Sequence, residues 1–266
     1  MKKLFVFIAV AVFIAAAAMA SFIRLQTSVT TNLNQGVLKT SVSVVNKGDE
    51  PAHNVQAELR VAGQKILLDK VSQLGVNAKY SAAKKVKLNL DQPGQYPLVV
   101  VMHYTDGNQY PFSAVTCHTF NHQTGALPTD VFGKMSSSTF WQTGEVKLTL
   151  KNLSEQELQV SAKLHTPREL TVIDNDKKIF IAPKSSAKVK FKLENFSALS
   201  GSSYQLFAVA EYAKDGFHQT SVIPATVRLE EVRLFLGINY SYLVGLLGAL
   251  VILFLLIQFG LPLIKK

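Results

Sequence analysis

Hydrophobic and polar residues alternate with a period of two through much of the chain between residues 21 and 233. The clearest alternating segments are 54–61, 85–90, 146–151 and 188–193. This period is typical of strands that bury one face, and no segment of this region has the 3.6-residue period of an amphipathic helix. Residues 98–102 are apolar on both faces, which predicts a central strand. Turn-forming residues separate these segments, at 46–49, 93–94, 106–108 and 215–216. The pattern predicts an all-β body of sandwich type.

Two halves of this region repeat one another. Segment 44–59 is similar to 149–164, and segment 94–107 is similar to 201–216. The aligned anchors are Asn46 with Asn152, Tyr96 with Tyr204, Tyr104 with Tyr212, and Gly107 with Gly216. Because the spacing is nearly constant, it indicates a duplicated domain. We expect two β-sandwich domains, residues 21–122 and 131–233, joined by a linker at 123–130 that is rich in turn formers.

The order of these motifs resembles a known kind of module. A strand, an Asn-Lys-Gly turn at 46–48 and a second strand are followed by Gly-x-Tyr-x-Leu-x-Val at 94–100 and an Asp-Gly turn at 106–107. The pattern is similar to the seven-stranded, Ig-like CARDB and NEW3-type modules of exported prokaryotic proteins, over residues 36–112 and, more loosely, 144–226. The resemblance implies an extracytoplasmic Ig-like fold used for adhesion, spacing or as an accessory to another protein. It carries over no catalytic residues.

The beginning of the sequence has the pattern of a secretory signal. Lys2 and Lys3 precede an apolar run at 4–17, and Ala-Met-Ala at 18–20 places small residues where signal peptidase cleaves. We therefore expect a signal peptide at 1–20. Phe22 and Ile23 continue the apolar character, so an uncleaved N-terminal anchor is the alternative.

The other end has the pattern of a membrane span. Residues 234–264 carry no charge, and the apolar run at 242–261 would span about 30 Å as a helix. Lys265 and Lys266 follow it, and the positive-inside rule places them in the cytoplasm. We expect one transmembrane helix at 240–264 in the cytoplasmic (inner) membrane, with the body outside the cytoplasm. Its Gly245, Gly248 and Gln258 are candidates for contact with a partner helix.

Charge and composition narrow the possible functions. The chain has 28 basic and 18 acidic residues, but Lys2, Lys3, Lys265 and Lys266 belong to the predicted targeting and membrane segments. The exported body then keeps 24 basic and 18 acidic residues, and an exported, anchored domain is not expected to bind nucleic acid. A single cysteine excludes a disulfide framework, a cysteine zinc finger and a cysteine-ligated iron–sulfur cluster.

Candidate chemistry is sparse. There is no nucleophile elbow or zinc-protease motif, so we expect no enzymatic activity and no cofactor. His103, Cys117 and His122 are weak candidates for copper ligands, because the spacing to Met135 is not that of a blue-copper loop. A buried thiol is the alternative for Cys117.

Aromatic residues offer a different kind of site. Trp141 with Phe140, and Tyr110 with Phe112, are candidate platforms for a polysaccharide, with core packing as the alternative. The leading hypothesis is a membrane-anchored, non-catalytic accessory or scaffold protein that binds a partner protein or membrane complex. A polysaccharide-binding module is the alternative, and a copper-handling domain is a lesser one.

Overall fold

The computed structural model describes residues 22–125, 128–231, 234–235, 238–239, 242–250 and 253–254. This part of the chain is all-β except for helical residues at 242–250 and 253–254. The predicted signal peptide, most of the predicted span at 240–264, and Gln258 lie outside the described residues. Within the described residues, no helix is both long enough and apolar enough to cross a membrane.

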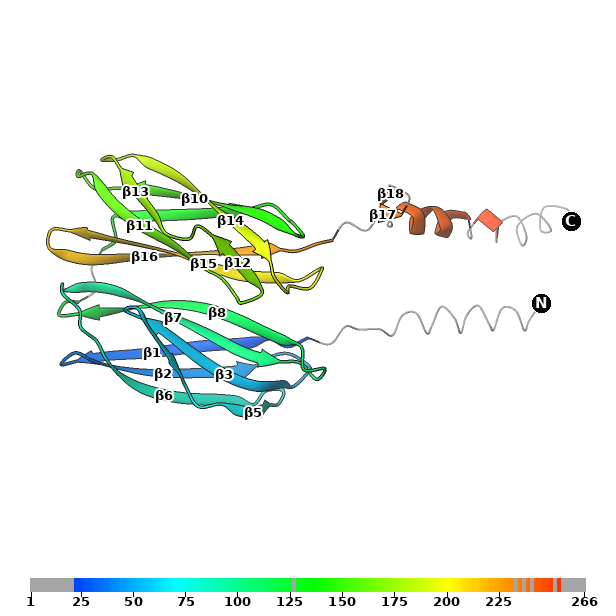
Figure 1. Ribbon diagram of the computed structural model, residues 1–266, viewed down its shortest axis with the longest axis horizontal. Helices are drawn as coiled ribbons and strands as arrows, with labels where there is room; N and C mark the ends of the chain where they lie inside the picture. Colours follow the sequence, from blue (N-terminus) through cyan, green and yellow to red (C-terminus); the bar gives the residue numbers. More distant parts are fainter. Residues whose placement is uncertain are drawn as a thin grey trace, which may run out of the picture.

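The N-terminal sandwich (residues 22–122) packs two antiparallel sheets over one core (Figure 1). One sheet has the order β1-β2-β6, from strands β1 (Leu25–Asn34), β2 (Val37–Asn46) and β6 (Lys79–Lys87). The facing strands are β3 (Ala52–Val61), β4 (Gln64–Leu67), β5 (Val71–Leu74), β7 (Gly94–Thr105) and β8 (Pro111–His122). In that sheet β3 pairs with β4, β5 and β7, and β7 pairs with β8.

The C-terminal sandwich (residues 128–231) repeats this plan around a second core. One sheet has the order β12-β14-β10-β9, from β9 (Val131–Ser137), β10 (Thr143–Asn152), β12 (Leu170–Ile173) and β14 (Ser186–Asn195). The facing sheet has the order β13-β11-β15-β16, from β11 (Leu158–His165), β13 (Lys177–Ile181), β15 (Ser203–Lys214) and β16 (Phe217–Arg228). In both sandwiches the first two strands lie across the core from the third strand and the last two, which is an Ig-like arrangement. A further small hairpin joins β17 (Leu234–Phe235) and β18 (Ile238–Asn239).

The alternating pattern explains these strands. In β10, for example, Val146, Leu148 and Leu150 are fully buried. Lys147 and Lys151, which alternate with them, are exposed. Residues 98–102 form the centre of β7, as predicted, and all of them are buried. Leu98, Val100 and Met102 face the core of the N-terminal sandwich, whereas Val99 and Val101 pack against Phe207 of the other sandwich. The apolar run therefore reflects contact between the two sandwiches.

The repeated asparagines have the same role in each sandwich. The Asn46 side-chain amide donates to the carbonyls of Glu50 and Leu74, and its oxygen accepts from the Gly48 N–H. The Asn152 amide donates to the carbonyls of Gln156, Ile181 and Ala182, and its oxygen accepts from the Ser154 N–H. Both side chains are fully buried. Each asparagine thus ties the turn after its strand to a neighbouring loop, which accounts for the repeat at this position.

A junction at one corner joins the two sandwiches into a nine-stranded sheet. Strand β7 meets β16 in a single parallel pair, Gly94 with His218, and the His218 N–H donates to the Pro93 carbonyl at 2.9 Å. Gly94 has a φ of 145°, and a Cβ there would lie 2.0 Å from the His218 carbonyl oxygen. Only glycine allows the two backbones to approach this closely.

Replacing Asn152 by alanine should destabilise the C-terminal sandwich by at least about 2 kcal/mol, because buried carbonyls and the Ser154 N–H lose their partners. Denaturant unfolding followed by the fluorescence of Trp141, the single tryptophan, measures the change. Asn32→Ala, on an exposed face of β1, is the control and should change stability by less than about 0.5 kcal/mol. Equal effects of the two substitutions would contradict the structural role of Asn152.

Replacing Gly94 by alanine should separate the two backbones at the junction and cost about 1–3 kcal/mol. Thermal unfolding should then lose cooperativity, so that circular dichroism and Trp141 fluorescence report different midpoints. Gly201→Ala is the matched control, since Gly201 also has a positive φ, 84°, but a Cβ added there would have no atom within 4 Å. A cooperative, unshifted transition in Gly94→Ala would show that this contact does not hold the sandwiches together.

Candidate functional site: the cleft between the sandwiches

A buried carboxylate fixes one side of the junction. Glu169 is fully buried and accepts the Ser113 N–H at 2.6 Å and the Ser113 hydroxyl at 2.7 Å. The Arg168 N–H donates in turn to the Ser113 hydroxyl oxygen at 2.8 Å. Burial raises the pKa of Glu169, and the bonds from Ser113 oppose that rise. These bonds hold strand β8 against the loop between β11 and β12.

A stacked histidine, His218, fixes the other side of the junction between the sandwiches. The His218 ring lies parallel to the Tyr96 ring, with centroids 4.0 Å apart and planes 3° apart. Its Nδ1 lies 2.8 Å from the Gln95 carbonyl oxygen and its Nε2 lies 3.3 Å from a Glu211 oxygen. Burial lowers the pKa of His218, but the bonds to Glu211 and to the Gln95 carbonyl outweigh it, so the pKa is raised. The imidazole is therefore held in an environment that favours its charged form.

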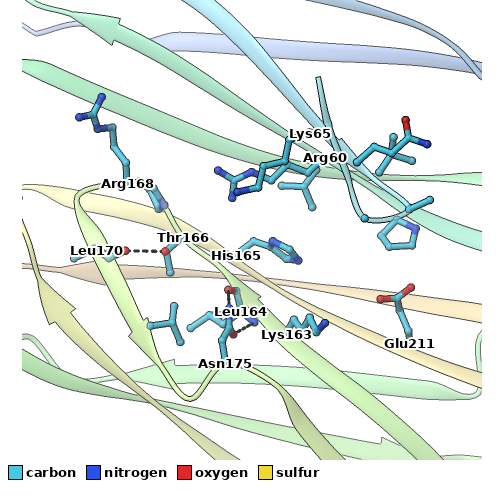
Figure 2. A pocket seen from close by; sticks show the side chains of 18 of the residues that line it. Arg60, Lys65, Lys163, Leu164, His165, Thr166, Arg168, Leu170, Asn175 and Glu211 are labelled. Carbon is cyan, nitrogen blue, oxygen red and sulfur yellow. Dashed lines mark hydrogen bonds between the residues drawn. The ribbon is translucent and has the colours of Figure 1, made fainter. Parts of the chain in front are cut away.

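Between these contacts and the outer edge of the sheets lies an open cleft of about 960 Å³ (Figure 2). It forms because the two facing sheets pack closely at β7, β8, β15 and β16, while β3 and β11 carry polar residues on their outer faces. The N-terminal sandwich contributes Arg60 and Lys65, and the C-terminal sandwich contributes Lys163, His165 and Arg168. Both sandwiches are needed to form the cleft.

The cleft is strongly positive. Four basic side chains line it, and Glu211 is the one carboxylate among its lining residues. Arg60 is paired with Glu58 at 2.5 Å, and Lys163 with Asp176 at 3.5 Å. Within residues 22–125 and 128–231, neither Lys65 nor Arg168 forms an ion pair. These two cations are available for an anion from outside the chain.

His165 is kept neutral inside this basic lining. Burial, followed by the positive charges of Arg60 and Lys163, lowers its pKa to about 4, although Glu211 acts in the opposite direction. In Figure 2 the His165 ring lies below Arg60 and Lys65, and Glu211 is drawn to the right of the ring. At neutral pH the His165 side chain therefore presents a polar but uncharged ring to the cleft.

Two neutral polar side chains of the cleft, Asn175 and Thr166, are already hydrogen-bonded within their own sandwich. The Asn175 side chain accepts the Leu164 N–H at 2.7 Å and donates to the Leu164 carbonyl at 2.9 Å. The Thr166 hydroxyl donates to the Leu170 carbonyl at 2.9 Å (Figure 2). The cleft also offers a ligand charged donors around apolar side chains such as Pro97 and Val172.

The aromatic candidates lie elsewhere. Phe140 is buried in the core of the C-terminal sandwich, and Trp141 is half-buried and packs against that core. Tyr110 donates its hydroxyl to the Ser197 carbonyl of the other sandwich at 2.5 Å. Phe112 packs against Tyr110 with ring centroids 5.1 Å apart. The Tyr110–Phe112 pair therefore takes part in the contact between the sandwiches.

The copper candidates are not brought together. In the β7–β8 hairpin His122 lies opposite Gly94, Cys117 opposite Val99, and His103 opposite Ser113. At about 3.3 Å per residue, His103 and His122 are separated by roughly 30 Å along the strands. The described residues contain no group of three or more His, Cys, Asp or Glu side chains that could hold a metal. Burial raises the pKa of the Cys117 thiol to about 12, so it stays protonated.

Of the proposed helix contacts, Gly245 and Gly248 lie in the helical segment 242–250. A Cβ on either glycine would have no atom within 4 Å among the described residues. Sequence reasoning did not identify the cleft, since its basic residues come from strands and loops about 100 residues apart. The outward-facing position of Arg60 in the alternating segment 54–61 was the only local signal.

No known protein family matches the chain, and no characterised relative matches it in sequence. Solved structures share parts of the architecture at low similarity. Transglutaminase from red sea bream is 11% identical with a TM-score of 0.29, and the match covers 83% of this chain and 33% of that one. Alpha-2-macroglobulin from E. coli in its native conformation is 11% identical with a TM-score of 0.32, covering 77% and 17%.

A third structure is a complex of a chaperone with the tip adhesion subunit of Csu pili from Acinetobacter baumannii. The matched chain is 12% identical with a TM-score of 0.27, and the match covers 77% of this chain and all of that one. The chain thus spans only 33% and 17% of the first two proteins. Resemblance at these scores carries no argument about function.

Because the folded pKa of His165 lies below the unfolded value of about 6.5, the unfolded chain binds more protons between pH 4 and 6.5. The contribution of His165 to stability is therefore complete above pH 6.5 and is lost as the pH falls towards 4. His165→Gln should remove a difference of up to about 3 kcal/mol between these limits. Unfolding at a series of pH values, followed by Trp141 fluorescence, measures this difference.

Each pH profile of stability is compared with that of the unmodified protein. The raised pKa of Glu169 gives a pH dependence of opposite sign, and this contribution cancels in the comparison. His53→Gln, outside the cleft, is the control and should leave the pH profile in place. If His165→Gln also left it unchanged, His165 would not be the group held neutral by the cleft.

Proposed function

We propose that this protein is a membrane-anchored, extracytoplasmic accessory or scaffold protein that binds a partner protein and performs no catalysis. In this proposal the two sandwiches are separate Ig-like domains, residues 21–122 and 131–233, joined by the linker at 123–130. A signal peptide at 1–20 directs export, and a single helix at 240–264 anchors the body to the outer face of the cytoplasmic membrane.

The observation that carries the proposal is the cleft to which both sandwiches contribute. Binding sites occur preferentially at interfaces between domains. The contacts of Glu169 with Ser113 and of His218 with Gln95 and Tyr96 fix the two walls relative to one another. A preformed site loses little conformational entropy on binding, which favours a stable association.

The positions of the body's two ends support an anchored body. Strand β1 begins and β16 ends at the same end of the body (Figure 1). Phe22 and Leu199 line a common hollow there, and the Glu231 N–H donates to the Ser200 hydroxyl at 2.9 Å. The proposed anchor at 240–264 follows the end of the body at which both β1 begins and β16 ends, which fits a body that stands on one membrane surface. The hairpins at the far end would point away from that surface.

The test is purification of the full-length protein from its native membrane in mild detergent, with quantitative mass spectrometry of what accompanies it. A stoichiometric partner protein is expected, because the cleft is preformed. A version whose residues 240–264 are replaced by an unrelated membrane helix shows whether that helix recognises the partner. Recovery of the protein alone, from membranes cross-linked before extraction, would overturn the proposed function.

A further inference from the structure

We propose that the cleft binds an extended acidic segment of a partner protein, with carboxylates at its basic rim and aliphatic side chains on its floor. This inference rests on the proposed function, because it identifies the chemistry of the partner that the protein would hold. It follows from the charges, the occupied hydrogen bonds and the aromatic contacts of the cleft.

The first step is the charge of the rim. Lys65 on one wall and Arg168 on the other have no ion-pair partner within residues 22–125 and 128–231, and both are exposed. Arg60 and Lys163 add charge beside them even though each is already paired. A ligand that reaches both walls therefore meets cations on either side, which favours a chain with several negative groups.

The second step is the floor. Pro97 and Val172 give the cleft apolar side chains between its charged groups, and His165 adds an uncharged ring. A purely ionic polymer would leave this apolar surface without a partner. A peptide in which acidic residues alternate with aliphatic ones places its two kinds of side chain on opposite faces when it is extended. Such a peptide matches both the rim and the floor.

The third step separates a peptide from an acidic polysaccharide. An acidic polysaccharide brings many hydroxyls besides its carboxylates, and two of the neutral side chains in the cleft, Asn175 and Thr166, are already bonded to the backbone of their own sandwich (Figure 2). Sugar rings also stack on exposed aromatic faces. Tyr96 is the one tyrosine, phenylalanine or tryptophan lining the cleft, and its ring is stacked on His218 and packs against Phe120. The available groups therefore favour carboxylates and aliphatic side chains.

The test measures binding to the purified full-length protein in mild detergent by fluorescence anisotropy. The probe is a short labelled peptide of alternating glutamate and valine, and the comparison peptide alternates lysine and valine. We expect saturable binding of the acidic peptide, weakened by salt because exposed charges are screened, and no binding of the basic peptide. Polygalacturonate serves as an acidic polysaccharide competitor and should not displace the peptide at an equal concentration of carboxylate.

Two matched variants locate the site. Lys65→Glu combined with Arg168→Gln should weaken peptide binding by about tenfold or more, because both walls lose their unpaired cation. Arg168 is changed to glutamine so that no negative charge is placed beside Glu169. Lys84→Glu combined with Lys188→Gln makes the same change in net charge at lysines of the outer sheets, and should bind as the unmodified protein does. Trp141 fluorescence unfolding checks that both variants are folded.

Three results would overturn the inference. The first is that the acidic peptide does not bind. The second is an equal loss of peptide affinity in the two double variants. The third is displacement of the peptide by polygalacturonate that depends on Lys65 and Arg168. Purifying the cleft variant (Lys65→Glu combined with Arg168→Gln) from native membranes separates failure of this inference from failure of the proposed function. A partner that stays with the cleft variant leaves the proposed function standing and removes the cleft as its site. If the unmodified protein has no partner, the proposed function fails, and peptide binding still decides the chemistry of the cleft.

Discussion

The structure depends on a face-to-face contact between two sheets that closes around a buried carboxylate. Isolated sandwiches of this type expose one polar face on each sheet, and nothing in a sandwich core requires two such faces to meet. Here Val99, Val101 and Phe207 bury apolar area between them, while Glu169 is withdrawn from water. Burying a carboxylate is costly unless it is hydrogen-bonded, and both of its oxygens accept from Ser113. That requirement fixes the relative position of the two walls, because a small displacement would leave the carboxylate unpaired.

The cleft is a consequence of where this contact stops. Along β7, β8, β15 and β16 the sheets touch through apolar residues, among them Val99, Val101 and Phe207. On β3 and β11 the outward residues are polar and include Arg60 and Lys163, and these two side chains line the cleft. The outer faces of the two sheets therefore form both the contact between the sandwiches and the cleft. The basic character of the cleft comes from Arg60 on β3 and Lys163 on β11, together with Lys65 on β4 and Arg168 in the loop after β11.

Much of the fold is local and could be predicted from the sequence. Alternation defines which residues of a strand are buried, and the repeat of Asn46 at Asn152 marks the same turn in both sandwiches, where each side chain makes equivalent hydrogen bonds. The repeat is less informative where the two copies have different neighbours. Tyr204 packs in the core of its own sandwich, whereas the aligned Tyr96 stacks on His218 of the other sandwich. No period or spacing in one strand specifies such a contact, since it depends on which two sheet faces meet. The cleft escapes prediction for the same reason, and so does the contact of Tyr110 with Ser197, which joins residues 87 positions apart in the chain.

Glu211 connects the cleft to the junction. It is the one carboxylate among the cleft's lining residues, and it lies 3.3 Å from His218 Nε2, on the ring that stacks against Tyr96. A negatively charged ligand bound as proposed at Lys65 and Arg168 would add to the negative potential of Glu211, and so would further favour the charged form of His218. The charged ring donates from both nitrogens: the bond to the Glu211 carboxylate lies within the C-terminal sandwich, and the bond to the Gln95 carbonyl joins β16 to the start of β7. By linkage, a ligand that favours protonation of His218 binds more tightly when His218 is charged. A ligand in the proposed site and the bond between the His218 ring and the Gln95 carbonyl would then stabilise one another.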